Sequence, residues 1–321
     1  MNSTLKNLCK VIPGTIVEGK WHHNRFTILK ELGSGANGIV YLAQFHNQKV
    51  ALKMSDNGMS ITSEVNVLKS FAKVQGSSLG PSLIDVDDWQ VRNHNISFYV
   101  MEYIEGPDLL SFISQKGQGW TEVLILQLLS DLQTLHEKGW VFGDLKPENL
   151  IVMGPPPRIR CIDVGGTTIQ GRAIKEFTEF YDRGYWGLGT RKADPTYDLF
   201  AVGMILINSE YPKRFNKTSG GLNQLRDMIN QKKELQKYET VILNALQGRY
   251  RTAREMRLDM LQIPNPPANS RTSTTQKPKT RAAVHPTRQT YQKRKGGWIE
   301  TFLIVTLVSI LYFIYIYGQV F

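Results

Sequence analysis

Cysteine is scarce in this sequence, with two among 321 residues. Cys9 and Cys161 are far apart and no histidine pattern flanks them, which excludes a disulfide framework and argues against a zinc site. The first twenty residues contain no continuous apolar run, so no secretory signal peptide is predicted. These two absences favour a reducing, cytosolic setting for the N-terminal part of the chain.

Acidic residues are absent from residues 262–297, although the whole chain has 28 of them. This segment is rich in Pro, Ser, Thr and Gln and poor in apolar residues, so we expect a disordered linker. It also holds eight basic residues, and subtracting them from the formal net charge leaves 11 − 8 = +3, which is ordinary for a globular enzyme. The eight are Arg271, Lys277, Lys279, Arg281, Arg288, Lys293, Arg294 and Lys295.

Charged residues are absent again after Glu300, where the sequence is apolar to residue 321. A helix over those residues would be about 31 Å long, close to the hydrocarbon thickness of a bilayer. We expect residues 298–321 to form one transmembrane helix, the alternative being a buried core helix. Basic residues precede it and none follows, so the positive-inside rule predicts a single-pass tail anchor in the cell membrane with a cytoplasmic N-terminal part. Aromatic residues typical of membrane interfaces flank the span: Trp298, Tyr312, Tyr315 and Tyr317.

Hydrophobic periodicity predicts an α+β fold for the remainder of the chain. The first predicted elements are strands over 25–32, 38–45 and 49–55 and a helix over 60–74. From about residue 108 helical patterns dominate, and the segment 119–139 predicts a long helix capped by Thr121. The outline is an N-terminal extension over 1–19, followed by a small β-rich lobe and a larger α-rich lobe that together span 20–261.

Glycines recur in the segment ELGSGANGIVYLA, at Gly33, Gly35 and Gly38, between two predicted strands. Glycine lets a backbone approach phosphates closely and offer N–H donors to them. The spacing alone is weak evidence. However, a strand follows the loop here, whereas a helix follows it in the dinucleotide-binding fold. The strand-loop-strand context instead matches the loop that covers ATP phosphates in protein kinases.

A lysine and a glutamate follow where a phosphate-binding lysine and its partner would be needed. Lys53 lies in VALK on the next predicted strand but one, and Glu64 lies on the helix after it. The alternatives are a solvated strand lysine and an ordinary surface glutamate. An ion pair between them would orient Lys53 toward the α- and β-phosphates of ATP.

Four further residues complete a phosphoryl-transfer constellation. GDLKPEN supplies Asp144, Lys146 and Asn149, and CIDVGG supplies Asp163. Phosphoryl transfer needs an Asp to orient or accept the proton of the attacking hydroxyl and a Lys to neutralise the transferred group. Asn149 and Asp163 are expected to hold Mg²⁺, with Mn²⁺ as an alternative metal. In this order and at these separations, chance is a poor explanation.

From Gly19 to Leu261 the chain resembles the eukaryotic-like Ser/Thr protein kinases. The resemblance implies the bilobal protein-kinase fold, with ATP between the lobes, its adenine against residues 101–106, and Asp198 supporting the backbone of the catalytic loop. The whole arrangement, with a basic linker and one C-terminal span, is similar to membrane-anchored sporulation kinases of the YabT type. The nucleotide-binding residues it implies are Leu32, Gly33, Ser34, Gly35, Ala36, Asn37, Gly38, Val40, Ala51, Lys53, Glu64, Glu102 and Tyr103.

The chain departs from the family pattern beside Asp144, where Phe142 and Gly143 replace the usual His and Arg. Phe142 suits a packing role. Gly143 offers no charge to a phosphate on the activation segment, so activation by phosphorylation there should matter less. Val164 follows the metal-binding Asp, and no A-P-E sequence with a Glu for the usual buried ion pair is evident. Because the chemical groups are retained, we expect an active enzyme; the alternative is a membrane-tethered pseudokinase scaffold.

The basic linker, residues 271–295, has three interpretations. It is a flexible spacer, a surface for anionic lipid, or a nonspecific DNA-binding segment. A DNA-binding adaptor without phosphotransfer is therefore a second alternative function. The linker's Ser and Thr residues are candidate autophosphorylation sites, and phosphorylation in trans would involve a homodimer. The predicted function is that of a Ser/Thr protein kinase acting on protein substrates.

Overall fold

The computed structural model describes residues 8–35, 37–72, 79–218 and 220–263. The side chains of Phe71 and Ala72 are not among the features described. Over these residues no helix is both long and apolar enough to cross a membrane. Ala36, almost all of the predicted linker and the predicted membrane span lie outside the described residues.

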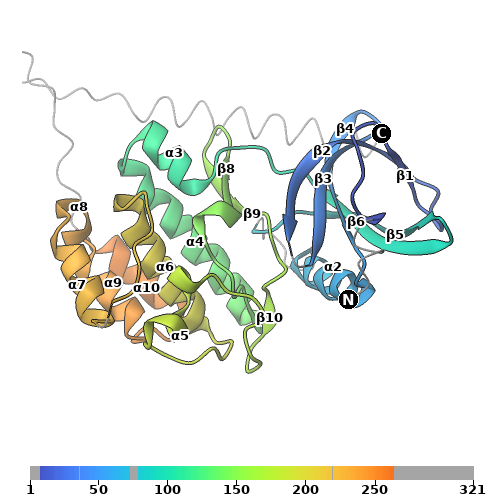
Figure 1. The fold of residues 1–321 in the computed structure, drawn as a ribbon. Helices are drawn as coiled ribbons and strands as arrows, with labels where there is room; N and C mark the ends of the chain where they lie inside the picture. The colour runs from blue at the N-terminus through green and yellow to red at the C-terminus, as the bar shows by residue number, and fades with distance from the viewer. Residues whose placement is uncertain (1–7, 36, 73–78, 219, 264–321) are drawn as a thin grey trace, which may run out of the picture. The chain divides into compact units, whose positions relative to one another are not determined.

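The small lobe is a six-stranded antiparallel sheet with the strand order β1-β2-β3-β4-β6-β5 (Figure 1). Helix α2, Gly58–Ala72, packs against β4, β5 and β6. The predicted strands correspond to β2, β3 and β4, and the predicted helix corresponds to α2. The strands are β1 Ile16–Glu18, β2 Arg25–Gly35, β3 Gly38–Phe45, β4 Gln48–Ser55, β5 Leu83–Val91 and β6 His94–Glu102.

A short strand before the predicted boundary at residue 20 already belongs to the small-lobe sheet. Strand β1 pairs with β2, so that Val17 lies opposite Phe26 and both are fully buried. The Tyr41 hydroxyl donates to the carbonyl of Cys9 at 2.8 Å and accepts the N–H of Val11 at 3.1 Å. The short strand escaped prediction because three residues are too few to show an alternating pattern.

The large lobe is built around α6, which is buried along most of its length. Its sequence PTYDLFAVGMILINSE begins with Pro at the first helical position, where the missing N–H costs nothing, and continues with an apolar run that α4, α9 and α10 cover. The helices are α3 Leu109–Lys116, α4 Gly119–Glu137, α5 Arg183–Trp186, α6 Pro195–Glu210, α7 Leu222–Asn230, α8 Lys233–Gln236, α9 Glu239–Leu246 and α10 Ala253–Leu261.

Short strands and 3₁₀ turns in the large lobe carry the segments that face the small lobe. Strands β7 and β10 pair with each other, and β8 pairs with β9. The 3₁₀ turn η1 directly precedes β8, and one residue, Asp182, separates η2 from α5. These elements are β7 Trp140–Val141, η1 Pro147–Asn149, β8 Leu150–Met153, β9 Arg158–Cys161, β10 Thr168–Ile169 and η2 Glu179–Tyr181.

Helix α4 starts two residues before the predicted cap, Thr121. Its N-terminal flanking residue is Gln118, and Thr121 lies inside the first turn with 4% of its surface exposed. The Thr121 hydroxyl donates to the Gln118 side-chain oxygen at 3.0 Å. The prediction of Thr121 as the cap is therefore wrong: its hydroxyl bonds a side chain rather than a free backbone N–H of the helix end.

Asp131 on α4 is a carboxyl group whose burial raises its pKa to about 6, although the charges of Arg158 and Arg160 oppose that shift. A carboxyl whose pKa is higher in the folded state stabilises the fold while it is protonated, and the benefit is lost as pH rises through the folded pKa. The pKa of Asp131 is 3.8 in the unfolded chain and about 6 in the folded protein. The contribution of Asp131 to the free energy of unfolding should therefore fall between about pH 4 and pH 7.

We expect Asp131→Asn to increase the free energy of unfolding at pH 7.5 by about 2 kcal/mol and to change it little at pH 4. Denaturant unfolding of the variant and of the wild type at both values checks this. Asp227→Asn removes the same charge from an exposed position on α7 and should stay within about 0.5 kcal/mol of wild type. An Asp131→Asn variant that is less stable than wild type at pH 7.5 would contradict the expectation.

Candidate active site

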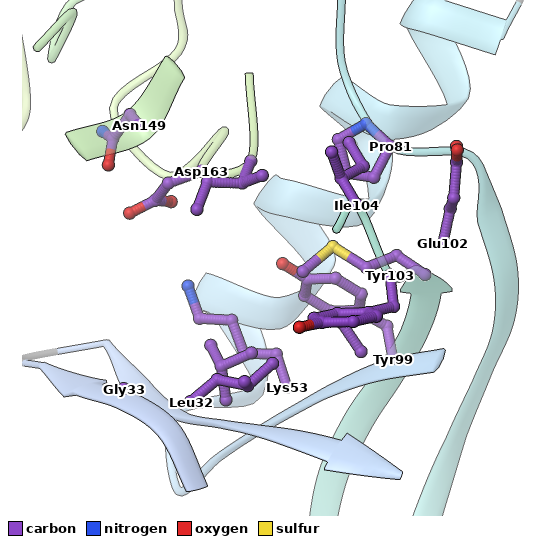
Figure 2. Close-up of a pocket in the computed structure, with 14 residues that line it drawn as sticks. Leu32, Gly33, Lys53, Pro81, Tyr99, Glu102, Tyr103, Ile104, Asn149 and Asp163 are labelled. Atoms are coloured by element: carbon purple, nitrogen blue, oxygen red, sulfur yellow. The ribbon is translucent and has the colours of Figure 1, made fainter. Parts of the chain in front are cut away.

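An apolar cavity of about 200 Å³ lies where the small lobe joins the large one (Figure 2). Leu32, Val40 and Ala51 line it from the small-lobe sheet, and Ile162 lines it from the large lobe. Residues 101–104, which leave β6 toward the large lobe, form another wall. A mainly apolar slot of this kind fits a flat heteroaromatic ring, and adenine is such a ring.

A polar cavity adjoins this slot under the β2–β3 hairpin. Gly33, Ser34, Gly35, Asn37 and Gly38 all line it. Gly38 has a φ of +132°, and a Cβ there would come 2.4 Å from the carbonyl oxygen of Met54, so no side chain fits. At Gly33 and Gly35 an added Cβ would meet nothing within 4 Å, so no clash requires glycine there. The absence of side chains at these two positions leaves space in the cavity that they line. The glycine-rich loop therefore offers room and backbone donors for phosphates.

Lys53 projects into both cavities and is held by Glu64. Lys53 Nζ lies 2.6 Å from Glu64 Oε2, and the two residues are only 8% and 3% exposed. The Tyr99 hydroxyl donates to the same carboxylate oxygen at 2.8 Å, and burial together with Glu64 raises the pKa of Tyr99 well above its ordinary value. The solvated alternatives for Lys53 and Glu64 are excluded. Glu64 contacts Lys53 but does not itself line the nucleotide cavity or the cavity under the β2–β3 hairpin.

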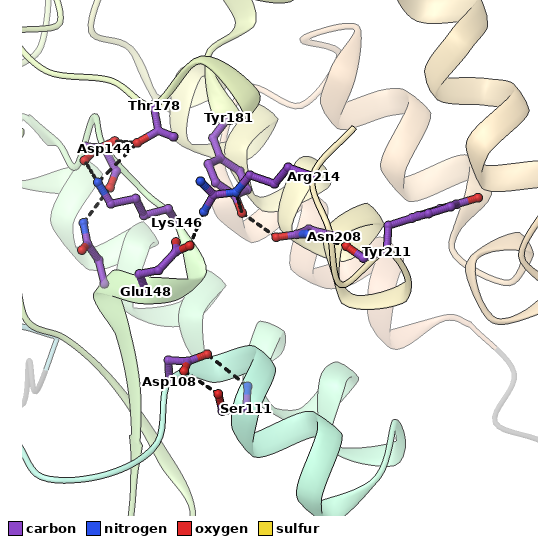
Figure 3. A network of polar contacts seen from close by, with 11 residues as sticks. Asp108, Ser111, Asp144, Lys146, Glu148, Thr178, Tyr181, Asn208, Tyr211 and Arg214 are labelled. Atoms are coloured by element: carbon purple, nitrogen blue, oxygen red, sulfur yellow. Dashed lines mark hydrogen bonds and ion pairs between the residues drawn. The ribbon is translucent and has the colours of Figure 1, made fainter. Parts of the chain in front are cut away.

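The catalytic-loop residues predicted from GDLKPEN are brought together. Lys146 Nζ donates to Asp144 Oδ2, and Asn149 Nδ2 donates to the Asp144 carbonyl at 3.1 Å (Figure 3). Asp144 is 8% exposed. Thr178, which the sequence did not point to, donates its hydroxyl to Asp144 Oδ1 at 3.0 Å and accepts from Lys146 Nζ at 3.3 Å. A carboxylate oriented by two donors faces the polar opening between the lobes.

Two predicted metal ligands, Asn149 and Asp163, line the mouth of the nucleotide cavity (Figure 2). Within the described ranges no group of three His, Cys, Asp or Glu side chains is arranged to hold a metal ion. One carboxylate and one amide oxygen suit a hard cation that completes its shell with phosphate oxygens and water, as Mg²⁺ does. The donor set therefore fits a metal that arrives with a nucleotide.

Asp198 on α6 holds the backbone of the catalytic loop through hydrogen bonds, as the resemblance implied. Asp198 is fully buried; it accepts the backbone N–H of Phe142 at 2.8 Å and that of Gly143 at 2.9 Å. His136 Nε2 lies 2.9 Å from the same carboxylate. The Phe142 side chain is 1% exposed, which confirms its packing role.

Gly143 meets a second glycine across the site, which explains the missing arginine. Its φ is +87°, and a Cβ at this position would lie 2.6 Å from the carbonyl oxygen of Gly166. In return, a Cβ on Gly166 would lie 2.9 Å from the Asp144 Cβ. The loop that carries Asp144 and the segment after Asp163 thus approach too closely for any side chain.

The segment after Asp163 is tied to the small lobe by two polar contacts that the sequence did not reveal. Lys175 Nζ donates to the Ser63 hydroxyl at 3.2 Å, and Asn37 Nδ2 donates to Glu176 Oε1. Burial raises the pKa of Glu176, and the neighbouring Asp163 carboxylate adds to the shift. These contacts join the segment to α2 and to the glycine-rich loop without a phosphate group.

An aspartate replaces the glutamate that the sequence lacked in this region. Asp182 is fully buried and pairs with Arg191 Nη2 at 2.6 Å. It also accepts the Tyr197 hydroxyl at 2.9 Å and two backbone N–H groups at the start of α5. Burial alone would raise the pKa of Asp182, but Arg191 and these hydrogen bonds hold it below its ordinary value. The buried carboxylate ion pair is present here in a form that no family motif predicts.

Glu102, like Glu64, is a predicted nucleotide-binding residue whose carboxylate lies outside the nucleotide cavity. Its carboxylate points away from the cavity and pairs with Arg160 through two bonds, of 3.1 and 2.9 Å (Figure 2). Burial would raise the pKa of Glu102, but Arg160 outweighs it and keeps the pKa low. Only the backbone of Glu102 is available to a ligand. Tyr103 lines the cavity as predicted.

Known proteins share this sequence to different extents. Residues 26–277 match the family described as the protein kinase domain. The chain is 54% identical to serine/threonine-protein kinase YabT of Bacillus subtilis, over 98% of each chain. A probable serine/threonine-protein kinase of Clostridium perfringens is 31% identical over 42% of this chain and 20% of its own length. Serine/threonine-protein kinase ULK3 of Rattus norvegicus is 28% identical over 57% of this chain and 41% of its own length.

The contact between Gly143 and Gly166 can be tested with a matched pair of substitutions. We expect Gly143→Ala to destabilise the protein by roughly 3 kcal/mol, because a positive φ costs about 1–2 kcal/mol and the Cβ also meets Gly166. Gly139→Ala is the control: its φ is +80°, but an added Cβ would meet nothing within 4 Å. Thermal unfolding of both variants measures the difference. Equal destabilisation would show that the close approach is unimportant.

Proposed function

The chain belongs to the protein kinase family as a serine/threonine protein kinase, and we propose that it transfers the γ-phosphoryl group of ATP to Ser and Thr hydroxyls of proteins. The family uses ATP with a divalent cation, for which we propose Mg²⁺, with Mn²⁺ as the alternative. The observation that carries this proposal is the convergence of five side chains around three neighbouring cavities: Lys53, Asp144, Lys146, Asn149 and Asp163.

Asp144 is proposed as the group that orients the attacking hydroxyl and accepts its proton. Its two oxygens are held by Thr178 and Lys146, and each carboxylate oxygen retains a lone pair for the substrate. Lys146 places a positive charge where negative charge builds up on the transferred group. When bound, the nucleotide and its cation supply the phosphoryl group and neutralise its charge. Asn149 and Asp163 would hold that cation, and Lys53 would contact the inner phosphates.

A pseudokinase would bind nucleotide without transferring phosphate, so the two reactions must be measured separately. We expect Asp144→Asn in the full chain to reduce phosphate incorporation into protein at least about 100-fold while changing ATP affinity less than about threefold. Labelled ATP with Mg²⁺ measures transfer, and fluorescent-nucleotide displacement measures binding. Asp227→Asn, an exposed change on α7, should retain wild-type transfer. Incorporation that is the same in wild type and Asp144→Asn defeats the enzyme proposal.

The C-terminal part of the proposal rests on sequence. We propose that residues 298–321 anchor the protein in the cell membrane by a single span, with the kinase domain in the cytoplasm. The order of kinase domain, basic linker and span also supports a place among membrane-anchored sporulation kinases. Crowding on a membrane or on DNA would favour homodimers and autophosphorylation in trans, for which the linker's Ser and Thr residues are the proposed sites.

The eight basic residues of the linker are proposed to bind a polyanion, either DNA or anionic lipid. Replacing all eight by Gln in the full chain should abolish most of the binding to duplex DNA. If all eight contact phosphates, the salt slope of log K should be about −7 in wild type and near zero in the variant. Titration with duplex DNA in detergent, and in parallel with phosphatidylserine and phosphatidylcholine vesicles, separates the two ligands. If the variant binds both as wild type does, the linker is only a spacer.

A further inference from the structure

Glu148 follows the catalytic Asp144 by four residues, and its carboxylate is already occupied by a cation of the same chain. Arg214 Nη2 donates to Glu148 Oε1 (Figure 3). The Glu148 side chain is 57% exposed, so it would otherwise be free to attract a basic side chain near the acceptor site. Arg214 offsets the negative charge of Glu148, so a substrate Arg or Lys is attracted to this carboxylate less strongly than to an unpaired one.

Arg214 is held in place by a buried network and is not a freely moving surface side chain. Its guanidinium lies over the Tyr181 ring, 4.9 Å from the centroid, and Nε donates to the Tyr181 hydroxyl at 3.3 Å. That hydroxyl in turn donates to Asn208 Oδ1 at 2.6 Å, and Tyr181 and Asn208 are 3% and 2% exposed. Asn208 belongs to α6, the same helix that holds the catalytic loop through Asp198. A guanidinium fixed in this way loses little conformational freedom when it binds a partner.

A cavity of about 350 Å³ opens beside Arg214. Phe180, Tyr185 and Phe215 form its apolar walls. Thr178 lines this cavity and also hydrogen-bonds Asp144, so the cavity lies one side chain away from the proposed base. A residue adjacent to the phosphorylated Ser or Thr would therefore enter it.

The charges around this cavity are of both signs. Glu179 lines it, and Lys217 Nζ donates to the Tyr185 carbonyl at its rim at 2.7 Å. The guanidinium of Arg214 has five N–H groups. One donates to Glu148 and one donates to Tyr181, so three remain that can donate to a substrate carboxylate. Glu148 is thus paired within the chain, and Nη1 of Arg214 keeps N–H donors that neither Glu148 nor Tyr181 uses.

We propose that Arg214 is a specificity-determining residue that makes this kinase disfavour basic residues beside the phosphorylated Ser or Thr and favour acidic ones. The proposal rests on the kinase function proposed above and names its substrate class. Pairing with Glu148 removes the attraction for a substrate cation, and the remaining N–H donors bind a substrate carboxylate inside the cavity.

Peptides with a single Ser acceptor and one variable flanking residue test this. Each position from −3 to +3 carries Asp, Ala or Arg in turn, and initial rates with labelled ATP give kcat/KM for the full chain. We expect wild type to prefer Asp over Arg by roughly tenfold at the best position, as a charge-assisted pair allows. Arg214→Glu should reverse the preference, and Arg214→Lys should retain part of it.

Lys213→Glu is the matched control, because it reverses the neighbouring exposed charge on the same loop. It should keep the wild-type preference. An unchanged Asp-to-Arg ratio in Arg214→Glu would overturn the proposal, even if all rates fell, because equal loss on every peptide indicates a merely structural role. Equal rates on Asp and Arg peptides with wild type would overturn it while leaving the kinase function intact. Failure of wild type on every peptide would defeat both.

Discussion

The buried carboxylate of Asp198 is the constraint on which the rest of the catalytic site depends. It accepts the N–H groups of Phe142 and Gly143 and so fixes the backbone directly before Asp144. A fully buried charge is tolerated only when its hydrogen bonds are satisfied, and losing its partners would cost about 3–5 kcal/mol. The catalytic loop therefore cannot shift without exposing an unsatisfied charge in the middle of the large lobe. The apolar α6 around Asp198 makes that restraint strong, because water cannot replace the donors.

Buried carboxylates with satisfied partners also hold the small-lobe side of the site and the segment after Asp163. Lys53 and Glu64 form a nearly buried pair, which Tyr99 supports from the opposite strand. In the segment that leads back to α6, the fully buried Asp182 pairs with Arg191, whose side chain is 44% exposed. The first pair links β4 to α2, and the second links the start of α5 to the loop that follows it. The active arrangement is therefore maintained by internal charges, and no phosphate is needed to complete these contacts.

Control by an activation-segment phosphate is further disfavoured by the packing of Gly143 against Gly166. The sequence showed only that an arginine was missing. In the structure its place is filled by a close backbone contact, so the loss is a feature of how two loops meet. Lys175 and Glu176 add links from the segment to the small lobe. These contacts leave little structural role for a phosphate beside Asp144.

The sequence by itself determined the chemical groups and the order of the elements around them. Lys53, Asp144, Lys146, Asn149 and Asp163 sit in local motifs, and short-range spacing with hydrophobic alternation is enough to recognise them. Its errors were also local: strand β1 is too short to show a period, and Thr121 looked like a cap although it lies inside α4.

Only the tertiary structure decided which charges meet. Asn37 and Glu176, separated by 139 positions, and Glu148 and Arg214, separated by 66, carry no spacing signal. Their pairing depends on where packed helices and loops bring side chains that look like ordinary surface residues in the sequence. That is the physical reason why the sequence could name the reacting groups, and Glu64 and Asp198 through local motifs and the family resemblance, but could not name Glu176 or Arg214.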